Sequence, residues 1–145
     1  MIWQTALTFK DQPQFRRMMP LLGRFFDETA YRQRGTFMFR AIDIAATVAQ
    51  TQAGTPGEAP VLARGLCKTW STASNNGWYT GTRDKLESLV KKLGEPSAPA
   101  IREAIVAQRK WLTNAPRDER SAVLNRDCSL QDVQQRLSEL ERLLN

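Results

Sequence analysis

The sequence contains no histidine in its 145 residues. Histidine is the side chain that titrates nearest neutral pH, and it is also the commonest metal ligand. Its absence excludes Ser-His-Asp and Cys-His catalytic arrangements. The only cysteines are Cys67 and Cys128, with no Cys-x-x-Cys motif, so too few ligands remain for a structural zinc site. We expect both thiols to be reduced and partly buried.

Other catalytic signatures are missing as well. The chain has no Gly-x-x-x-x-Gly-Lys phosphate loop and no Gly-x-Gly-x-x-Gly motif. Asp27 and Glu28 are adjacent, so on a helix they would point about 100° apart and could not share one face. We interpret them as partners of the arginines on both sides. The sequence therefore predicts no enzyme activity, no metal and no cofactor.

Long apolar runs are also lacking. The longest, residues 37–49, is interrupted by Arg40 and Asp43, so no transmembrane helix is expected. Residues 2–9 are apolar, but no basic region precedes them and they are too short for a secretory signal. We therefore expect a cytoplasmic protein without a membrane partner.

Helical periodicity dominates what is present, and no strand-like alternation stands out. Residues 36–52 are apolar almost all round, which is typical of a helix in the middle of a fold. Helix breakers lie at Gly35, Gly94 and the 54–60 segment. The pattern predicts an all-α single domain over residues 1–145, an irregular or orthogonal bundle of about six to eight helices. A subdomain break at 54–60 is the alternative.

The last helix has the clearest pattern. Ser129 and Asp132 resemble a capping box, and Asp132 and Arg136 are spaced to pair on the exposed side. Apolar residues step along it by three and four: Leu130, Val133, Leu137, Leu140 and Leu144. This stripe is either the inward face of a bundle helix or a surface for self-association or docking.

Basic residues exceed acidic ones by 21 to 15, which gives a net charge of +6, and 15 of the 21 are arginine. Arginine binds phosphate bidentately. We predict contacts with the nucleic-acid backbone, in DNA or RNA, from two groups. They are Arg16, Arg17, Arg24, Arg32 and Arg34 in the first group and Arg83, Lys85, Lys91 and Lys92 in the second. For any single cation, a solvated surface is the alternative.

Trp78 and Tyr79 lie in a predicted turn, with Thr82 as the expected N-cap of the next helix. Three interpretations stay open for this aromatic pair. The two rings stack on unpaired bases, they anchor a protein interface, or they close the end of the bundle.

The chain is small, basic, predicted to be helical and free of histidine. In these properties it resembles accessory subunits that line nucleic acid in larger ribonucleoproteins, including the helical small subunits of CRISPR effector complexes. The resemblance implies a non-enzymatic nucleic-acid-binding subunit of a larger complex and identifies no site residue. The alternative function is a protein–protein adaptor or immunity-type inhibitor that acts through Trp78, Tyr79 and the last helix.

Overall fold

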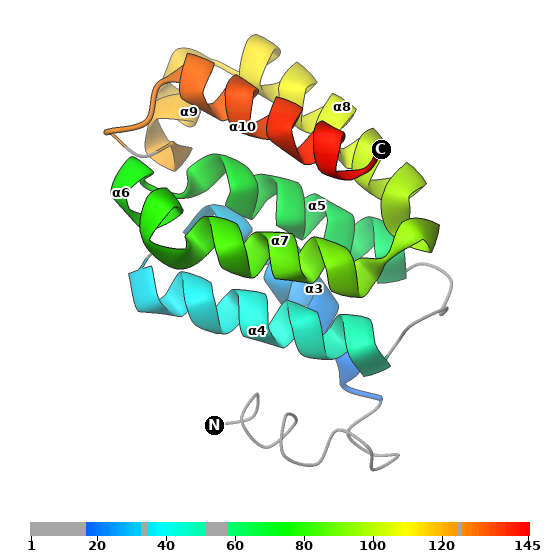
Figure 1. The fold of residues 1–145 in the computed structure, drawn as a ribbon. Coiled ribbons are helices and arrows are strands. Elements are labelled where there is room, and N and C mark those ends of the chain that lie inside the picture. Colours follow the sequence, from blue (N-terminus) through cyan, green and yellow to red (C-terminus); the bar gives the residue numbers. More distant parts are fainter. Residues whose placement is uncertain (1–16, 33–34, 52–57, 125) are drawn as a thin grey trace.

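The computed structural model describes residues 17–32, 35–51, 58–124 and 126–145. These residues form helices and turns without a strand, which confirms the predicted all-α class and the helical bundle (Figure 1). The order is α3 (Met19–Thr29), the 3-10 turn η1 (Ala30–Arg32), α4 (Gly35–Thr51), α5 (Glu58–Thr72), α6 (Asn75–Gly77), the π-helical turn η2 (Trp78–Thr82), α7 (Arg83–Leu93), the 3-10 turn η3 (Glu95–Ser97), α8 (Ala98–Asn114), α9 (Arg117–Val123) and α10 (Leu130–Leu143).

Helix α5 is the centre of the bundle. It packs against α3, α8, α10, α4 and α7. Figure 1 shows α3 and α4 on one side of it and α8 and α10 on the other. Two buried polar side chains of α5 keep their hydrogen bonds in this core. The hydroxyls of Thr69 and Ser71 each donate to a carbonyl one turn earlier, at 2.8 Å. The 36–52 helix was expected in the middle, but α4 instead leaves Phe37 and Asp43 exposed.

Close packing joins α3 to α5. Phe26 is fully buried, and it lies where a side chain at Gly65 would be. A Cβ at Gly65 would come within 2.6 Å of the Phe26 Cε2 atom and 3.2 Å of the Asp27 Cα atom. Glycine at this position therefore sets how near the two helices approach. Pro20 stands in the first turn of α3, where its missing N–H costs no hydrogen bond.

The helix boundaries follow local signals, with one correction. Gly94 ends α7 with a φ of 72°, as its glycine predicts. The expectation that Thr82 caps α7 is wrong, because Thr82 is buried in helical conformation and caps nothing through its side chain. Ser74 instead caps the preceding helix α6, since its Oγ accepts from the Gly77 N–H at 2.9 Å. Segments α6, η2 and α7 follow one another directly, but the path is kinked at Gly81, whose φ of 161° and ψ of −28° are not helical.

The capping box at the start of α10 is confirmed. The Ser129 Oγ accepts from the Asp132 N–H at 3.1 Å, and the Asp132 carboxylate accepts from the Ser129 N–H at 2.9 Å. In the predicted stripe, Val133, Leu137 and Leu140 are fully buried, so the middle of the stripe faces the bundle. Leu130, 36% exposed, is at the edge.

Candidate nucleic-acid interface

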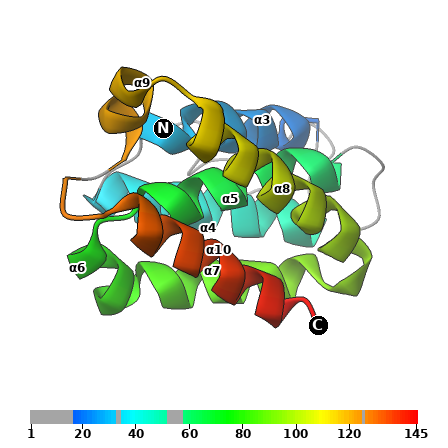
Figure 2. The ribbon, with the colours of Figure 1, turned by 90° about the horizontal axis from the view of Figure 1, so that it is seen from above.

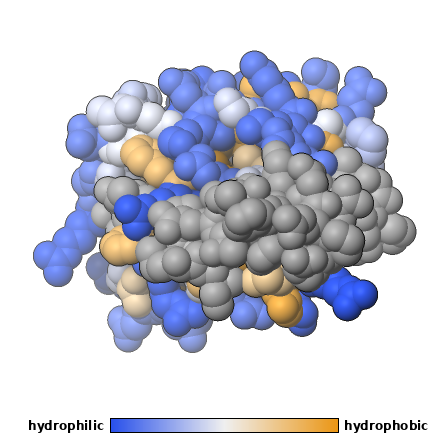
Figure 3. Space-filling view, turned by 90° about the horizontal axis from the view of Figure 1, so that it is seen from below, coloured by the Kyte–Doolittle hydropathy of each residue, from blue (hydrophilic) through white to orange (hydrophobic). Residues whose placement is uncertain are grey.

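The first predicted basic group lies along α3 and η1. Arg17 precedes α3, Arg24 is on it and Arg32 ends η1, and all three side chains are exposed. Arg16 and Arg34 lie outside the described residues. Figure 3 shows the face formed around α3 and α4, where hydrophilic side chains prevail among the coloured residues and hydrophobic ones are scattered.

Asp27 does not neutralise these arginines. Its carboxylate faces α5, where Oδ1 accepts from Lys68 Nζ at 2.7 Å and Oδ2 from Arg64 Nε at 3.1 Å. Lys68 Nζ also donates to the Asp27 carbonyl at 3.2 Å. The expected pairing of Asp27 with its neighbouring arginines is therefore wrong. Glu28 is left as the exposed carboxylate of residues 17–32.

The 3-10 turn η1, which carries Arg32, is attached to α8 through Tyr31. Tyr31 donates its hydroxyl hydrogen to Gln108 Oε1 at 2.9 Å, and its ring stacks on Trp111 with 5.2 Å between centroids. Lys68 Nζ lies 5.5 Å from the centre of the same ring. Burial raises the pKa of Tyr31, so its hydroxyl stays a donor at neutral pH. These contacts fix where η1 and Arg32 lie.

The second basic group, on α7, divides into paired and unpaired cations. Arg83 Nε donates to Glu87 Oε1 at 3.0 Å, a hydrogen bond that raises the pKa of Arg83. Lys85 Nζ lies 2.9 Å from an oxygen of Asp43 on α4. Exposed Lys91 and Lys92, in the last turn of α7, form no ion pair within the described part of the chain.

The two basic groups lie on separate surfaces. Helix α3 packs on α4 and α5, and α7 packs on the same two helices. Figure 2 shows α3 and α7 at opposite edges of the bundle, with α4 and α5 between them. A ligand held by α3 would have to pass around the bundle to reach α7.

The aromatic pair is divided between core and surface. Trp78 is 2% exposed and meets Trp70 edge to face, with 4.9 Å between ring centroids. Tyr79, the next residue, is 77% exposed. In this conformation Trp78 closes the end of the bundle and offers no ring face to a partner. Tyr79 alone is placed for stacking or for a protein contact.

A buried arginine holds this end of the bundle together. Arg136 on α10 is 4% exposed, and its guanidinium donates to the Ala73 carbonyl at 2.8 Å and to Asn75 Oδ1 at 2.6 Å. It also lies 4.6 Å from the centre of the Trp78 ring. The expectation that Arg136 pairs on the exposed side of α10 is wrong. Its i,i+4 spacing from Asp132 gave no sign of these partners on a distant segment.

Both cysteines lie in surroundings that disfavour the thiolate form. Burial raises the pKa of Cys67 to about 12, and burial also raises the pKa of Cys128. Both cysteines are free thiols that stay protonated at neutral pH, so neither supplies a thiolate nucleophile. Within the described ranges, no group of acidic or cysteine side chains could hold a metal ion. None of the helices there combines the length and the hydropathy that a membrane crossing requires.

Comparison with known proteins gave no relative. No family model, curated protein or solved structure matches the chain.

Proposed function

We propose that this chain is a non-enzymatic helical subunit that binds the phosphate backbone of nucleic acid, as part of a larger complex. The main support is the inward orientation of Asp27, which leaves Arg17, Arg24 and Arg32 exposed. None of these three arginines pairs with a carboxylate among residues that the structure describes. Unpaired surface cations release counterions from a polyanion when they bind it.

The other basic residues have unequal roles in this proposal. Lys91 and Lys92 are exposed and can meet a phosphate directly. Arg83 and Lys85 must first give up Glu87 and Asp43, so they contribute less. Interactions with the backbone alone carry no base readout, and we therefore propose binding with little sequence preference.

Salt-dependent binding tests the proposal. Fluorescence anisotropy with labelled single-stranded DNA and RNA measures affinity at several salt concentrations. The double variant Arg17→Glu with Arg24→Glu should weaken binding, and the log–log salt slope should fall by about 0.7 for each phosphate that is no longer neutralised on a single strand. The charge-matched control is Arg142→Glu with Lys110→Glu, both exposed on α10 and α8.

Two results would contradict the proposal. One is the absence of salt-dependent binding to either nucleic acid at low ionic strength. The other is an equal loss of affinity in the control variant. That result would mean that the net charge of the protein, and not Arg17 and Arg24, determines binding.

A protein–protein adaptor or inhibitor is the second candidate function, and the exposed ring of Tyr79 favours it. The ring borders a recess of about 100 Å³ that Gln135 and Glu139 of α10 also line. Exposed aromatics of this kind anchor interfaces. The adaptor function predicts a partner complex that survives nuclease and is weakened by Tyr79→Ala but not by Phe37→Ala, an aromatic 66% exposed on α4. Equal effects of the two changes, or loss of the complex on nuclease treatment, would count against it.

A further inference from the structure

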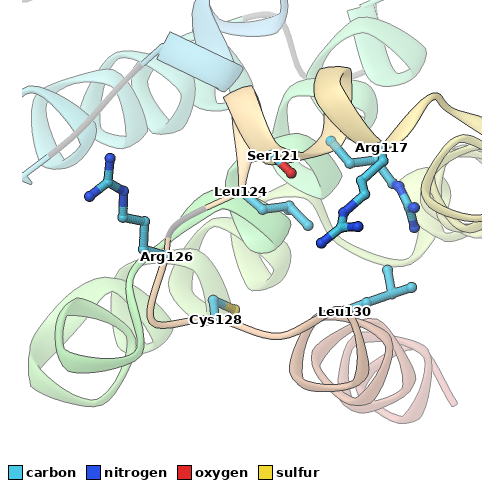
Figure 4. A pocket seen from close by; sticks show the side chains of 7 residues that line it. Arg117, Ser121, Leu124, Arg126, Cys128 and Leu130 are labelled. Carbon is cyan, nitrogen blue, oxygen red and sulfur yellow. The ribbon is translucent and has the colours of Figure 1, made fainter.

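A recess lies between α9, the residues Leu124, Arg126 and Cys128 that come after it, and the start of α10. Its volume is about 360 Å³, within the range of small-ligand sites. Three arginines, one hydroxyl and two leucines line most of it: Arg117, Arg120, Ser121, Leu124, Arg126 and Leu130. Figure 4 shows Arg117 and Ser121 on the α9 side and Leu130 opposite, while Arg126 extends away on the other side of Leu124.

The positive charge of this recess is not compensated within the described residues. No carboxylate lines it, and none of its arginines forms an ion pair there. Asp127, next to Arg126, accepts a hydrogen bond from the Asn75 N–H at 3.1 Å instead. An anion entering the recess would therefore meet guanidinium groups without displacing an acidic side chain.

Arg120 is held in place for such an anion. Its Nη1 donates to the Leu112 carbonyl at 3.1 Å, which anchors one edge of the guanidinium. Its Nε is buried and has no hydrogen-bond partner among residues that the structure describes. Because one guanidinium donor is used by Leu112 and Nε is enclosed by protein, the other donors of this guanidinium are the ones that can meet an oxyanion in the recess. Arg117 lies three residues earlier, on the same face of α9.

The recess also has an apolar wall. Leu130 is the first residue of the α10 stripe, and it remains 36% exposed because it borders this opening. Leu124 is half-buried beside it. Guanidinium groups and a hydroxyl can donate hydrogen bonds to a phosphate. The two leucines can pack against the sugar or the base of a nucleotide that carries this phosphate.

We propose that the recess binds one nucleotide, with its phosphate on Arg117 and Arg120 and its sugar or base against Leu124 and Leu130. The nucleotide is either a unit of the strand held by α3 or a free molecule. Binding of a strand unit rests on the proposed function. Binding of a free nucleotide does not depend on it.

Two probes distinguish the sources, adenosine 5′-monophosphate and a short single-stranded oligoadenylate. Leucine methyl NMR signals report occupation of the recess, and titration calorimetry reports affinity. Addition of the bound probe should shift the Leu124 and Leu130 signals. Arg117→Ala and Arg120→Ala should each weaken binding of that probe roughly tenfold.

Matched variants separate the recess from general charge. Arg126→Ala should have a smaller effect, since its side chain extends away, and Arg142→Ala, an exposed arginine on α10, should leave affinity within about twofold of the unchanged protein. Because Arg120 also bonds Leu112, thermal unfolding of Arg120→Ala is measured first. Arg117 has no such bond in the described residues, so Arg117→Ala keeps the test decisive if Arg120→Ala does not fold.

The outcomes separate this inference from the proposed function. Monophosphate binding that Arg117→Ala weakens roughly tenfold supports the recess as a free-nucleotide site, even if no strand binds. Oligoadenylate binding that is weakened both by Arg117→Ala and by the Arg17→Glu, Arg24→Glu double variant supports a strand unit in the recess. Oligoadenylate binding that depends on α3 but is unchanged in both α9 variants overturns the inference and leaves the proposed function standing. Leucine signals that neither probe shifts also overturn it.

Discussion

Replacing Arg136 with methionine should destabilise the protein strongly, although methionine is apolar and fits much of the same volume. The side chain joins three segments of the chain, through Ala73 just after α5, Asn75 in α6 and the Trp78 ring in η2. Methionine cannot donate a hydrogen bond to either acceptor, and it has no positive charge to form the cation–π interaction with the Trp78 ring. The Ala73 carbonyl and Asn75 Oδ1 would then lose the donor that Arg136 supplies.

The size of this effect follows from these interactions. Each hydrogen bond from a charged donor contributes about 1.5–3 kcal/mol, and a desolvated cation–π interaction about 2 kcal/mol. The desolvation of the charged group opposes these terms and is relieved by methionine. We therefore expect a net loss of about 3 kcal/mol in the free energy of unfolding, which lowers Tm by roughly 10 °C in a domain of this size.

Urea unfolding followed by tryptophan fluorescence measures the loss, since Trp70 and Trp78 lie at the junction. Arg142→Met, on the exposed side of the same helix, is the control and should change stability by less than about 0.5 kcal/mol. An Arg136→Met protein as stable as the unchanged one would refute the reasoning. It would mean that the cost of burying the guanidinium equals everything that its interactions contribute.

Four further effects follow from the structure. Gly65→Ala should lower the free energy of unfolding by about 2 kcal/mol in denaturant titrations, because the new methyl group would overlap the Phe26 ring. Ser129→Ala should cost about 1 kcal/mol by the same measurement through loss of the α10 cap. Hydrogen bonds from the Ser129 backbone and side chain hold the pKa of Asp132 below its ordinary value of 3.8, so the stability it contributes is present above that pH and is lost as pH falls through the lowered pKa. Asp132→Asn should flatten that part of the acid-unfolding curve. Finally, the Cys67 thiol, with a pKa of about 12, should react with a thiol reagent at mildly alkaline pH only after the protein unfolds.

Controls for these effects are available in the same chain. Gly23→Ala should be milder than the change at position 65, because its nearest neighbour is the flexible end of Glu58 at 3.1 Å. Ser88→Ala changes an exposed α7 serine for which no capping bond is seen, and it should leave stability nearly unchanged. Equal losses at positions 65 and 23 would contradict the packing argument. An acid-unfolding curve that Asp132→Asn leaves unchanged would contradict the argument about Asp132. Rapid labelling of Cys67 in the folded protein would contradict the argument about its raised pKa.

The fold class and several boundaries could be predicted because they depend on local physics. Gly94 ends α7 through a backbone conformation that favours glycine, and Ser129 starts α10 through bonds within one turn. The turn predicted at Trp78 and Tyr79 is instead helical, because α6 and η2 span residues 75–82. Ser74 restarts the helix at once, and that depends on a single serine oxygen.

The long-range contacts could not be predicted from one sequence. Asp27 stands among arginines along the chain, yet it pairs with Arg64 and Lys68 of α5, which only the crossing of the two helices brings near. Arg136 looked like an exposed partner of Asp132 because spacing cannot tell which face of α10 meets the core. Trp78 and Tyr79 are likewise consecutive residues with opposite environments, and only the bundle determines which ring is covered.

The attachment of α3 and η1 affects the entropy of any encounter with them. Asp27 ties the last turn of α3 to α5 through two cations, and Tyr31 ties η1 to α8. The backbone that carries Arg24 and Arg32 is thus ordered before a ligand arrives, and only their side-chain rotamers remain to be restricted. Preorganisation of this kind lowers the entropic cost of association and holds the charges at a fixed spacing that the ligand must match.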